Sequence, residues 1–111
     1  MPSPPEHVNQ VILRGKVSAL ASERTLPSGD TVVSARLVVK RPPDPKRRSA
    51  ITVDTFDCVA WTKRAQQALL GWQPDQVVEV TGRLRRRFRR LPTGPISRVE
   101  VEVMQSRRTP R

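Results

Sequence analysis

Residues 77–90 read VVEVTGRLRRRFRR, a stretch that begins apolar and carries six arginines in its last eight positions. Side chains alternate between the two faces of an extended strand, so the pattern predicts a strand over 77–87 with two unlike faces. One face is a core-facing row of Val78, Val80, Gly82 and Leu84, and the other is an arginine row of Arg83, Arg85, Arg87 and Arg89. Aligned guanidinium groups repel one another, so the row predicts an anionic partner, and nucleic acid is the first to consider.

The composition of the whole chain agrees with this reading. The chain has 111 residues, with 21 Lys and Arg against 10 Asp and Glu and a formal net charge of +11. Its length fits one domain with a modest core, and its charge favours nucleic acid or an anionic membrane surface. No apolar run approaches the ~18 residues of a membrane-spanning helix, and the N-terminal MPSPPEHVNQ lacks a signal-peptide pattern. The single cysteine, Cys58, excludes an internal disulfide, suits a reducing cytosol and is expected to be a small core residue.

Four further segments have the period of two that is typical of strands. Proline and glycine indicate a turn at 27–30, and the prolines of the basic segment 42–49 exclude a central strand there. In the last of the four segments the valines are expected to face inward and the charged residues outward. The predicted strands are 9–17, 31–41, 50–61 and 98–104; the inward valines are Val99, Val101 and Val103, opposite Arg98, Glu100 and Glu102.

The segment 62–72, TKRAQQALLGW, changes period. Its apolar residues fall at i, i+3, i+4 and i+7, which predicts a short amphipathic helix with Thr62 as N-cap and Trp72 as a core plug. Three strands, one helix and two strands is the element order of the OB-fold, a five-stranded Greek-key barrel. We therefore predict an all-β domain with one short helix between strands 3 and 4. The predicted parts are a flexible N-terminal tail at 1–8, the OB-fold at 9–105 and a short basic C-terminal tail at 106–111.

Five segments, taken in order, carry a family likeness. Over about residues 9–105 these segments read, in order, NQVILRGKV, LPSGDTVVSARLVVKRP, DTFDCVAW, VVEVTGRLRRR and VEVEVMQ. Together they resemble bacterial single-stranded DNA-binding protein. The resemblance implies an OB-fold that binds single-stranded DNA without sequence preference and assembles into a homo-oligomer, a tetramer or a dimer. It also implies a cytoplasmic, nucleoid-associated protein of DNA replication, recombination or repair.

The likeness carries over one stacking aromatic, Trp61, which matches the aromatic that ends the third strand in this family. At the other family positions stand Thr55 at the start of that strand, Pro43 beyond the second strand and Arg89 in the fourth, with Phe88 one residue early. The chain ends in SRRTPR, without the acidic, apolar tip with which family members recruit other proteins. We therefore expect no such recruitment, and an auxiliary role in DNA metabolism.

A single strand is bound by cations that follow its phosphates and by flat groups that stack on its bases. Guanidinium planes do both, so our hypothesis is that arginines replace the missing aromatics. Trp61 is expected on the concave face, with packing at the strand–helix junction as the alternative; for Phe88 packing at the core edge is favoured over stacking. For the cations of the 42–49 loop the alternative is a solvated surface. The candidate DNA-binding residues are Trp61, Thr55, Phe88, the arginine row Arg83, Arg85, Arg87 and Arg89, and the cations Arg36, Lys40, Arg41, Lys46, Arg47 and Arg48.

Other classes of function are less well supported by the sequence. The one histidine, His7, lies in the tail, the single cysteine excludes a CxxC zinc site, and no GxxxxGK[ST] loop occurs, so we expect no catalysis, cofactor or metal. An accessory OB-fold module that acts mainly through protein partners, like the primosomal replication protein, stays open, and a dimer would favour it. Single-stranded RNA also stays open, because stacking and phosphate contacts tolerate either sugar. Membrane binding is not expected without a long basic amphipathic helix.

Overall fold

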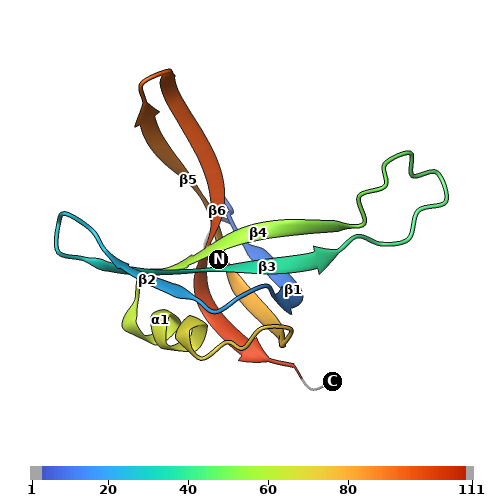
Figure 1. Cartoon of the computed structure of the whole chain (residues 1–111), viewed down its shortest axis with the longest axis horizontal. Helices are drawn as coiled ribbons and strands as arrows, with labels where there is room; N and C mark the ends of the chain where they lie inside the picture. Colours follow the sequence, from blue (N-terminus) through green and yellow to red (C-terminus); the bar gives the residue numbers. More distant parts are fainter. Residues whose placement is uncertain (1–3, 110–111) are drawn as a thin grey trace.

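The computed structural model describes residues 4–109. Within this range the chain forms six strands and one helix (Figure 1). The elements are β1 (Val11–Val17), β2 (Ser22–Thr25), β3 (Thr31–Lys40), β4 (Val53–Ala60), α1 (Lys63–Leu70), β5 (Val77–Leu91) and β6 (Gly94–Arg108).

The strands form one sheet in the order β1-β5-β6-β4-β3-β2. A further pairing of β1 with β3, which places Val17 opposite Leu37, closes five of these strands into a barrel. β4 and β6 run parallel, with Cys58 opposite Val101, and the other pairs are antiparallel. This is the predicted OB-fold barrel with β2 added at its edge. The helix follows the third strand of the barrel, which places it between β4 and β5 once β2 is counted.

The core fills the barrel, and α1 covers one end of it. Several of the alternating apolar residues of β1, β3 and β5 are buried, among them Val17, Leu37 and the predicted core-facing Val80. Trp72 is 1% exposed, and its indole N–H donates to Ser106 Oγ at 3.0 Å. The prediction that Trp72 is a core residue is therefore confirmed.

The local signals predicted for the helix and for Cys58 are also present. Thr62 caps α1, because its hydroxyl accepts a hydrogen bond from the backbone N–H of Ala65. Cys58 is fully buried, and desolvation, with a smaller contribution from the charge of Asp57, raises the pKa of its thiol to about 12. A thiol with this pKa stays protonated at neutral pH, so Cys58 is the inert core residue that we expected.

The long hairpin of β5 and β6 contains a β-bulge at Gly82. Thr81 pairs with Gln105 but Gly82 pairs with Val103, so Met104 is an extra residue on β6. A Cβ on Gly82 would overlap the backbone carbonyl oxygen of Glu102. Glycine is therefore required at this position of the pair.

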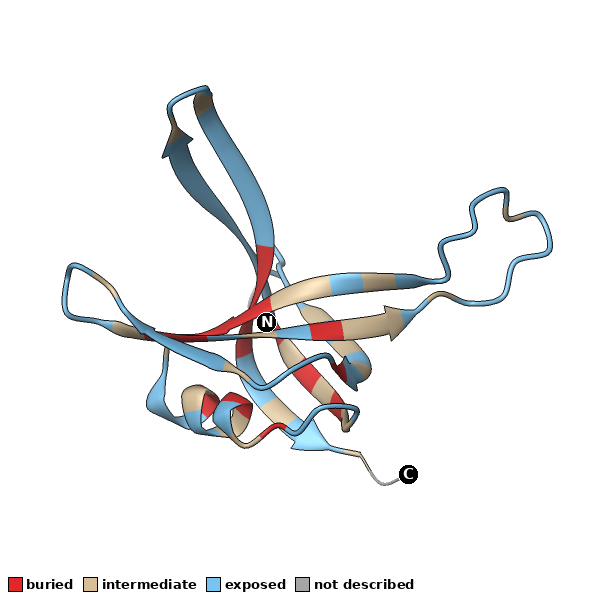
Figure 2. Cartoon of the chain, in the orientation of Figure 1, coloured by how far each residue is buried: buried red, intermediate tan, exposed pale blue. Residues whose placement is uncertain are grey.

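Beyond Val101 and Glu102 of β6, which still pair with β4, the hairpin leaves the barrel as a two-stranded arm, residues 84–100 (Figure 1). Figure 2 shows that buried residues end near the base of this arm. Leu84 and Val99, which we predicted to face the core, are 45% and 46% exposed, so these two predictions are wrong. The reason is that residues on the outer side of the arm no longer lie over the barrel.

Three segment boundaries differ from the sequence prediction. The strands predicted over 77–87 and 98–104 are longer, because pairing extends to Leu91 opposite Gly94 and a tight turn joins the two. β2 was missed because its four residues are polar and exposed and show no alternation. Residues 106–108 continue β6 and pair with β5, whereas residues 1–3, 110 and 111 of the predicted tails lie outside the described range. No helix within residues 4–109 is long and apolar enough to cross a membrane.

Candidate nucleic-acid interface

A groove of about 340 Å³ lies where the inner side of the arm meets β3 and β4. Residues 18–20, which follow β1, form part of its rim. Because its volume falls in the range of small-molecule sites, about 300–1,000 Å³, the groove can admit part of a nucleotide chain. Its charged lining residues are Arg36 of β3, Asp57 of β4, and Arg87, Arg89, Arg98 and Glu100 of the arm.

The part of the arginine row near the barrel is paired with a carboxylate. Arg83 lies opposite Glu102 and donates from Nε to its Oε2 at 2.6 Å, while Arg85 Nη1 lies 3.8 Å from the other oxygen of Glu102. The hydrogen bond to Glu102, together with its charge, raises the pKa of Arg83 above the ordinary value. Arg83 is therefore charged at any physiological pH, but its charge is partly neutralised within the protein.

The outer part of the row has no such partner. Arg87 lies directly opposite Arg98, and Arg89 lies opposite Ile96. None of these arginines forms an ion pair within residues 4–109. Like charges directly opposite each other destabilise a sheet, and an anion placed between them would remove the repulsion. Arg98 was missed as a site residue, because alternation alone assigned it to the solvent side of β6.

Two acidic residues on the same strand also lie differently from the prediction. Glu100 and Glu102 were expected to face outward, but each is only 8% exposed, so this prediction is wrong. The side of β6 opposite its valines is not open to solvent here. Glu100 and Glu102 lie beside the arginine row on the same face of the hairpin, and Glu100 lines the groove with β3 and β4. The groove therefore contains carboxylates among its guanidinium groups.

Trp61 comes directly after β4 and is half-buried. The guanidinium carbon of Arg85 lies 5.4 Å from the centre of its ring, within the range of a cation–π contact. The indole Nε1 is buried and has no hydrogen-bond partner among the residues that the structure describes. Arg85 thus connects Trp61 to the arginine row, and the two strongest sequence signals meet in one place.

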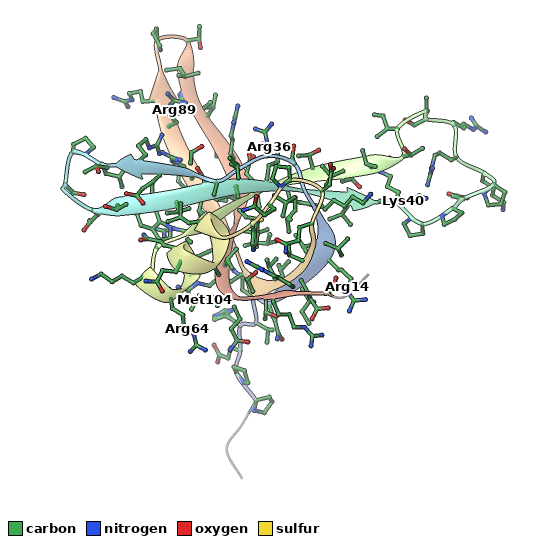
Figure 3. All side chains as sticks on the ribbon, turned by 60° about the horizontal axis from the view of Figure 1, so that its bottom comes forward. Arg14, Arg36, Lys40, Arg64, Arg89 and Met104 are labelled. Atoms are coloured by element: carbon green, nitrogen blue, oxygen red, sulfur yellow. The ribbon has the colours of Figure 1, made fainter. Side chains whose placement is uncertain are left out.

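The cations of β3 extend this surface. Arg36 Nε lies 3.2 Å from Asp57 Oδ1, and Lys40 at the end of the strand is exposed. In Figure 3 Arg89, Arg36 and Lys40 lie along one side of the molecule, while Arg64 and Met104 lie on another. Thr55, which faces Val38 across the β3–β4 pair, is exposed on the same stretch of sheet.

The loop between β3 and β4 does not join the groove. Arg41 donates two hydrogen bonds to Asp54, at 2.8 and 2.9 Å, which lower the pKa of Asp54 and raise that of Arg41. Arg47 donates to the carbonyl of Pro42, and Lys46 and Arg48 are exposed. Figure 1 shows this loop and the arm projecting from the barrel in different directions. Of the predicted site residues, Arg36, Arg87 and Arg89 line the groove, and the cations of the loop form a separate group.

Phe88 lies on the Leu84 side of the arm, as its position in the strand predicts. It is 75% exposed, so the packing that we expected at the core edge is absent. The arm has left the core at this point and nothing in the described range covers this side. Phe88 thus faces away from the arginine row.

Comparison with known proteins decides the family. The model of the Single-strand binding protein family matches residues 8–107. The chain belongs to the single-strand binding protein family. Its fold is similar to that of a Plasmodium falciparum SSB solved in complex with single-stranded DNA, with a TM-score of 0.74 over 95% of this chain and 96% of that chain at 17% identity. No curated protein matches the chain.

Family membership confirms the resemblance drawn from the five segments, and the structural match confirms the OB-fold. In this single-strand binding protein, Arg89 of β5 stands at the position where the sequence resemblance led us to expect an aromatic. Residues 4–109 contain no group of three or more His, Cys, Asp and Glu side chains that could hold a metal ion.

Proposed function

We propose that the protein binds single-stranded DNA in the groove between the arm and the β3–β4 pair, tolerant of base sequence. The observation that carries this proposal is the convergence of Arg36, Arg87, Arg89 and Arg98 on one groove. Arg87 and Arg98 lie opposite each other and have no carboxylate partner among residues 4–109. Phosphates placed between these guanidinium groups would be bound by charge-assisted hydrogen bonds and would relieve the repulsion. Such contacts are shared by every sequence.

The bases would stack beside the phosphates on Trp61 and Arg85. One face of the indole is already covered by Arg85, whose own side chain is 53% exposed. A base can therefore stack on the outer face of the guanidinium and extend the stack that begins at Trp61. This geometry supports the hypothesis that arginine takes over part of the stacking that aromatics perform elsewhere in the family.

From the groove the strand would continue over Thr55 and Lys40 toward the β3–β4 loop. The exposed cations there, Lys46 and Arg48, are free to contact phosphates, whereas Arg41 is held by Asp54. Phe88 would touch only a strand that wraps around the arm. The groove is the primary site in this proposal, and the loop is a secondary one.

Trp61→Ala is expected to weaken binding of oligo-dT by about 5- to 100-fold, because stacking contributes about 1–3 kcal/mol per base. The measurement is a fluorescence titration with Trp72→Phe as background, so that emission reports Trp61 alone and should be quenched by DNA. Thermal melting of Trp61→Ala is the control. A variant that melts at much lower temperature, or that binds as tightly as the parent, would favour packing at the strand–helix junction over stacking.

The proposal extends to the oligomeric state and to the choice between DNA and RNA. We propose that the protein acts as a homo-oligomer, and a mass measurement in solution separates the tetramer from the dimer that an accessory OB-fold module would form. Competition between DNA and RNA strands of equal length tests the RNA alternative, since a twofold or smaller difference would leave both polymers as ligands.

We place its action in the cytoplasm, at the nucleoid, in an auxiliary role in replication, recombination or repair. Family membership and a buried cysteine that needs no oxidising compartment support this assignment. Localisation of a fluorescent fusion tests it: a diffuse or membrane pattern that never overlaps the nucleoid would contradict it.

A further inference from the structure

Glu100 is the acidic residue of the groove that has no partner in the part of the chain that the structure describes. It is 8% exposed and lines the groove, yet its carboxylate forms no hydrogen bond or ion pair within residues 4–109. The other carboxylates of this surface are paired: Asp57 with Arg36, and Glu102 with Arg83. A buried carboxylate without a donor is unfavourable, so Glu100 is a site that a ligand can complete.

The ligand group that meets Glu100 cannot be a phosphate. Two negative charges in contact within a partly enclosed groove repel each other, whereas the neighbouring arginines are suited to phosphate. The matching group is a neutral hydrogen-bond donor. In a DNA strand such donors are the ring and exocyclic N–H groups on the edges of the bases.

The surroundings of Glu100 also suit a base. Val59 of β4, Leu20 of the rim and Ile96 of the arm line the same groove, and they offer apolar contact to the flat face of a ring. Arginines of the lining can hold the adjoining phosphates at the same time. The groove therefore has one part suited to the DNA backbone and another part suited to a base edge.

We propose that Glu100 is a specificity-determining residue that favours guanine in the bound strand. Guanine presents N1–H and N2–H side by side, and these can donate two parallel hydrogen bonds to the two oxygens of one carboxylate. Cytosine and adenine offer one exocyclic amino group, and thymine offers only its ring N–H. This inference rests on the proposed function and names the nucleotide that the groove prefers. Binding stays tolerant of sequence, because the phosphate contacts are common to all strands.

The test compares oligo-dT strands of equal length that carry isolated dG, isolated dI or no substitution at central positions. Inosine keeps N1–H but lacks the N2 amino group, so it removes one of the two hydrogen bonds. Fluorescence anisotropy should give at least about fivefold tighter binding for the dG strand than for oligo-dT, with the dI strand between them. In Glu100→Gln the three strands should bind within about twofold of one another, and oligo-dT should bind no more weakly than to the parent protein, because a negative charge has left the groove.

Glu23→Gln is the matched control, since it makes the same change in charge on β2 outside the groove lining. It should keep the preference for dG. Equal affinity of the parent protein for all three strands would overturn the inference while leaving the proposed function intact, and this comparison needs no variant to fold. If Glu100→Gln changed the affinity for all three strands by the same factor, the inference would also be overturned. Glu100 would then act on the neighbouring arginines and not on a base. Failure of the parent protein to bind any strand would contradict the proposed function itself.

Discussion

Replacing Arg87, Arg89 and Arg98 together by alanine should weaken binding of oligo-dT on the order of 100-fold at low salt. Each phosphate contact to a single strand contributes roughly −0.7 to the slope of log affinity against log salt, so the slope should become about 2 units shallower. Titrations at several salt concentrations measure both effects. The physical reason is that these guanidinium groups line the groove and have no carboxylate partner in the described range.

A matched variant separates the groove from the overall charge. Lys16→Ala, Lys63→Ala and Arg64→Ala together also remove three cations, but from β1 and α1, outside the groove lining. Figure 3 shows Arg64 on a different side of the molecule from Arg89 and Arg36. This variant should keep most of the affinity. If the two variants lost affinity and salt dependence equally, binding would reflect net charge alone, and the groove would not be the binding site.

Gly82→Ala should destabilise the protein by about 3 kcal/mol or more, or prevent folding. The new Cβ would overlap the carbonyl oxygen of Glu102, which is backbone and cannot swing away as a side chain could. Relief would require the β5–β6 pair to separate at the bulge near the base of the arm. Chemical denaturation followed by circular dichroism measures the loss of stability. Binding of oligo-dT should decrease as the folded fraction decreases.

Gly71→Ala is the control for this substitution. Gly71 has a φ of −86°, and an added Cβ would come no closer than 3.4 Å to another atom, the terminal nitrogen of the Arg108 side chain. Its effect should stay within about 0.5 kcal/mol, as for ordinary surface changes. Equal stability of Gly82→Ala and the parent protein would show that the strands do not approach as closely as the structure has them.

Much of the fold could be predicted because it rests on local patterns. Burial against a single barrel core explains the alternation of β1 and β3, the helical spacing that ends at Trp72 and the small apolar Cys58. The errors at Leu84 and Val99 have one cause: alternation tells which side of a strand a residue occupies, but it does not tell where the strand leaves the barrel. That point is set by where β6 stops pairing with β4, at Val101, which is a tertiary feature.

Part of the candidate site could also be predicted from local sequence patterns. The arginine row and Trp61 share a surface because both follow from strand parity. Arg98 and Glu100 were missed because their position depends on which residues lie opposite them. A two-residue turn at 92–93 would have placed Arg87 opposite Arg98, so the signal was present in the proline and glycine around that turn. The burial of Glu100 depends on β3 and β4 as well, and no local pattern carries that information.

The most direct test of the groove as the binding site is a nuclear magnetic resonance titration of the isotope-labelled protein with oligo-dT. The backbone amides and arginine Nε–H groups of residues 85–100, together with those of β3 and β4 around Arg36 and Trp61, are expected to show the largest changes. Shifts confined to α1 and β1, or no shifts at all with single-stranded DNA, would contradict the assignment of this groove.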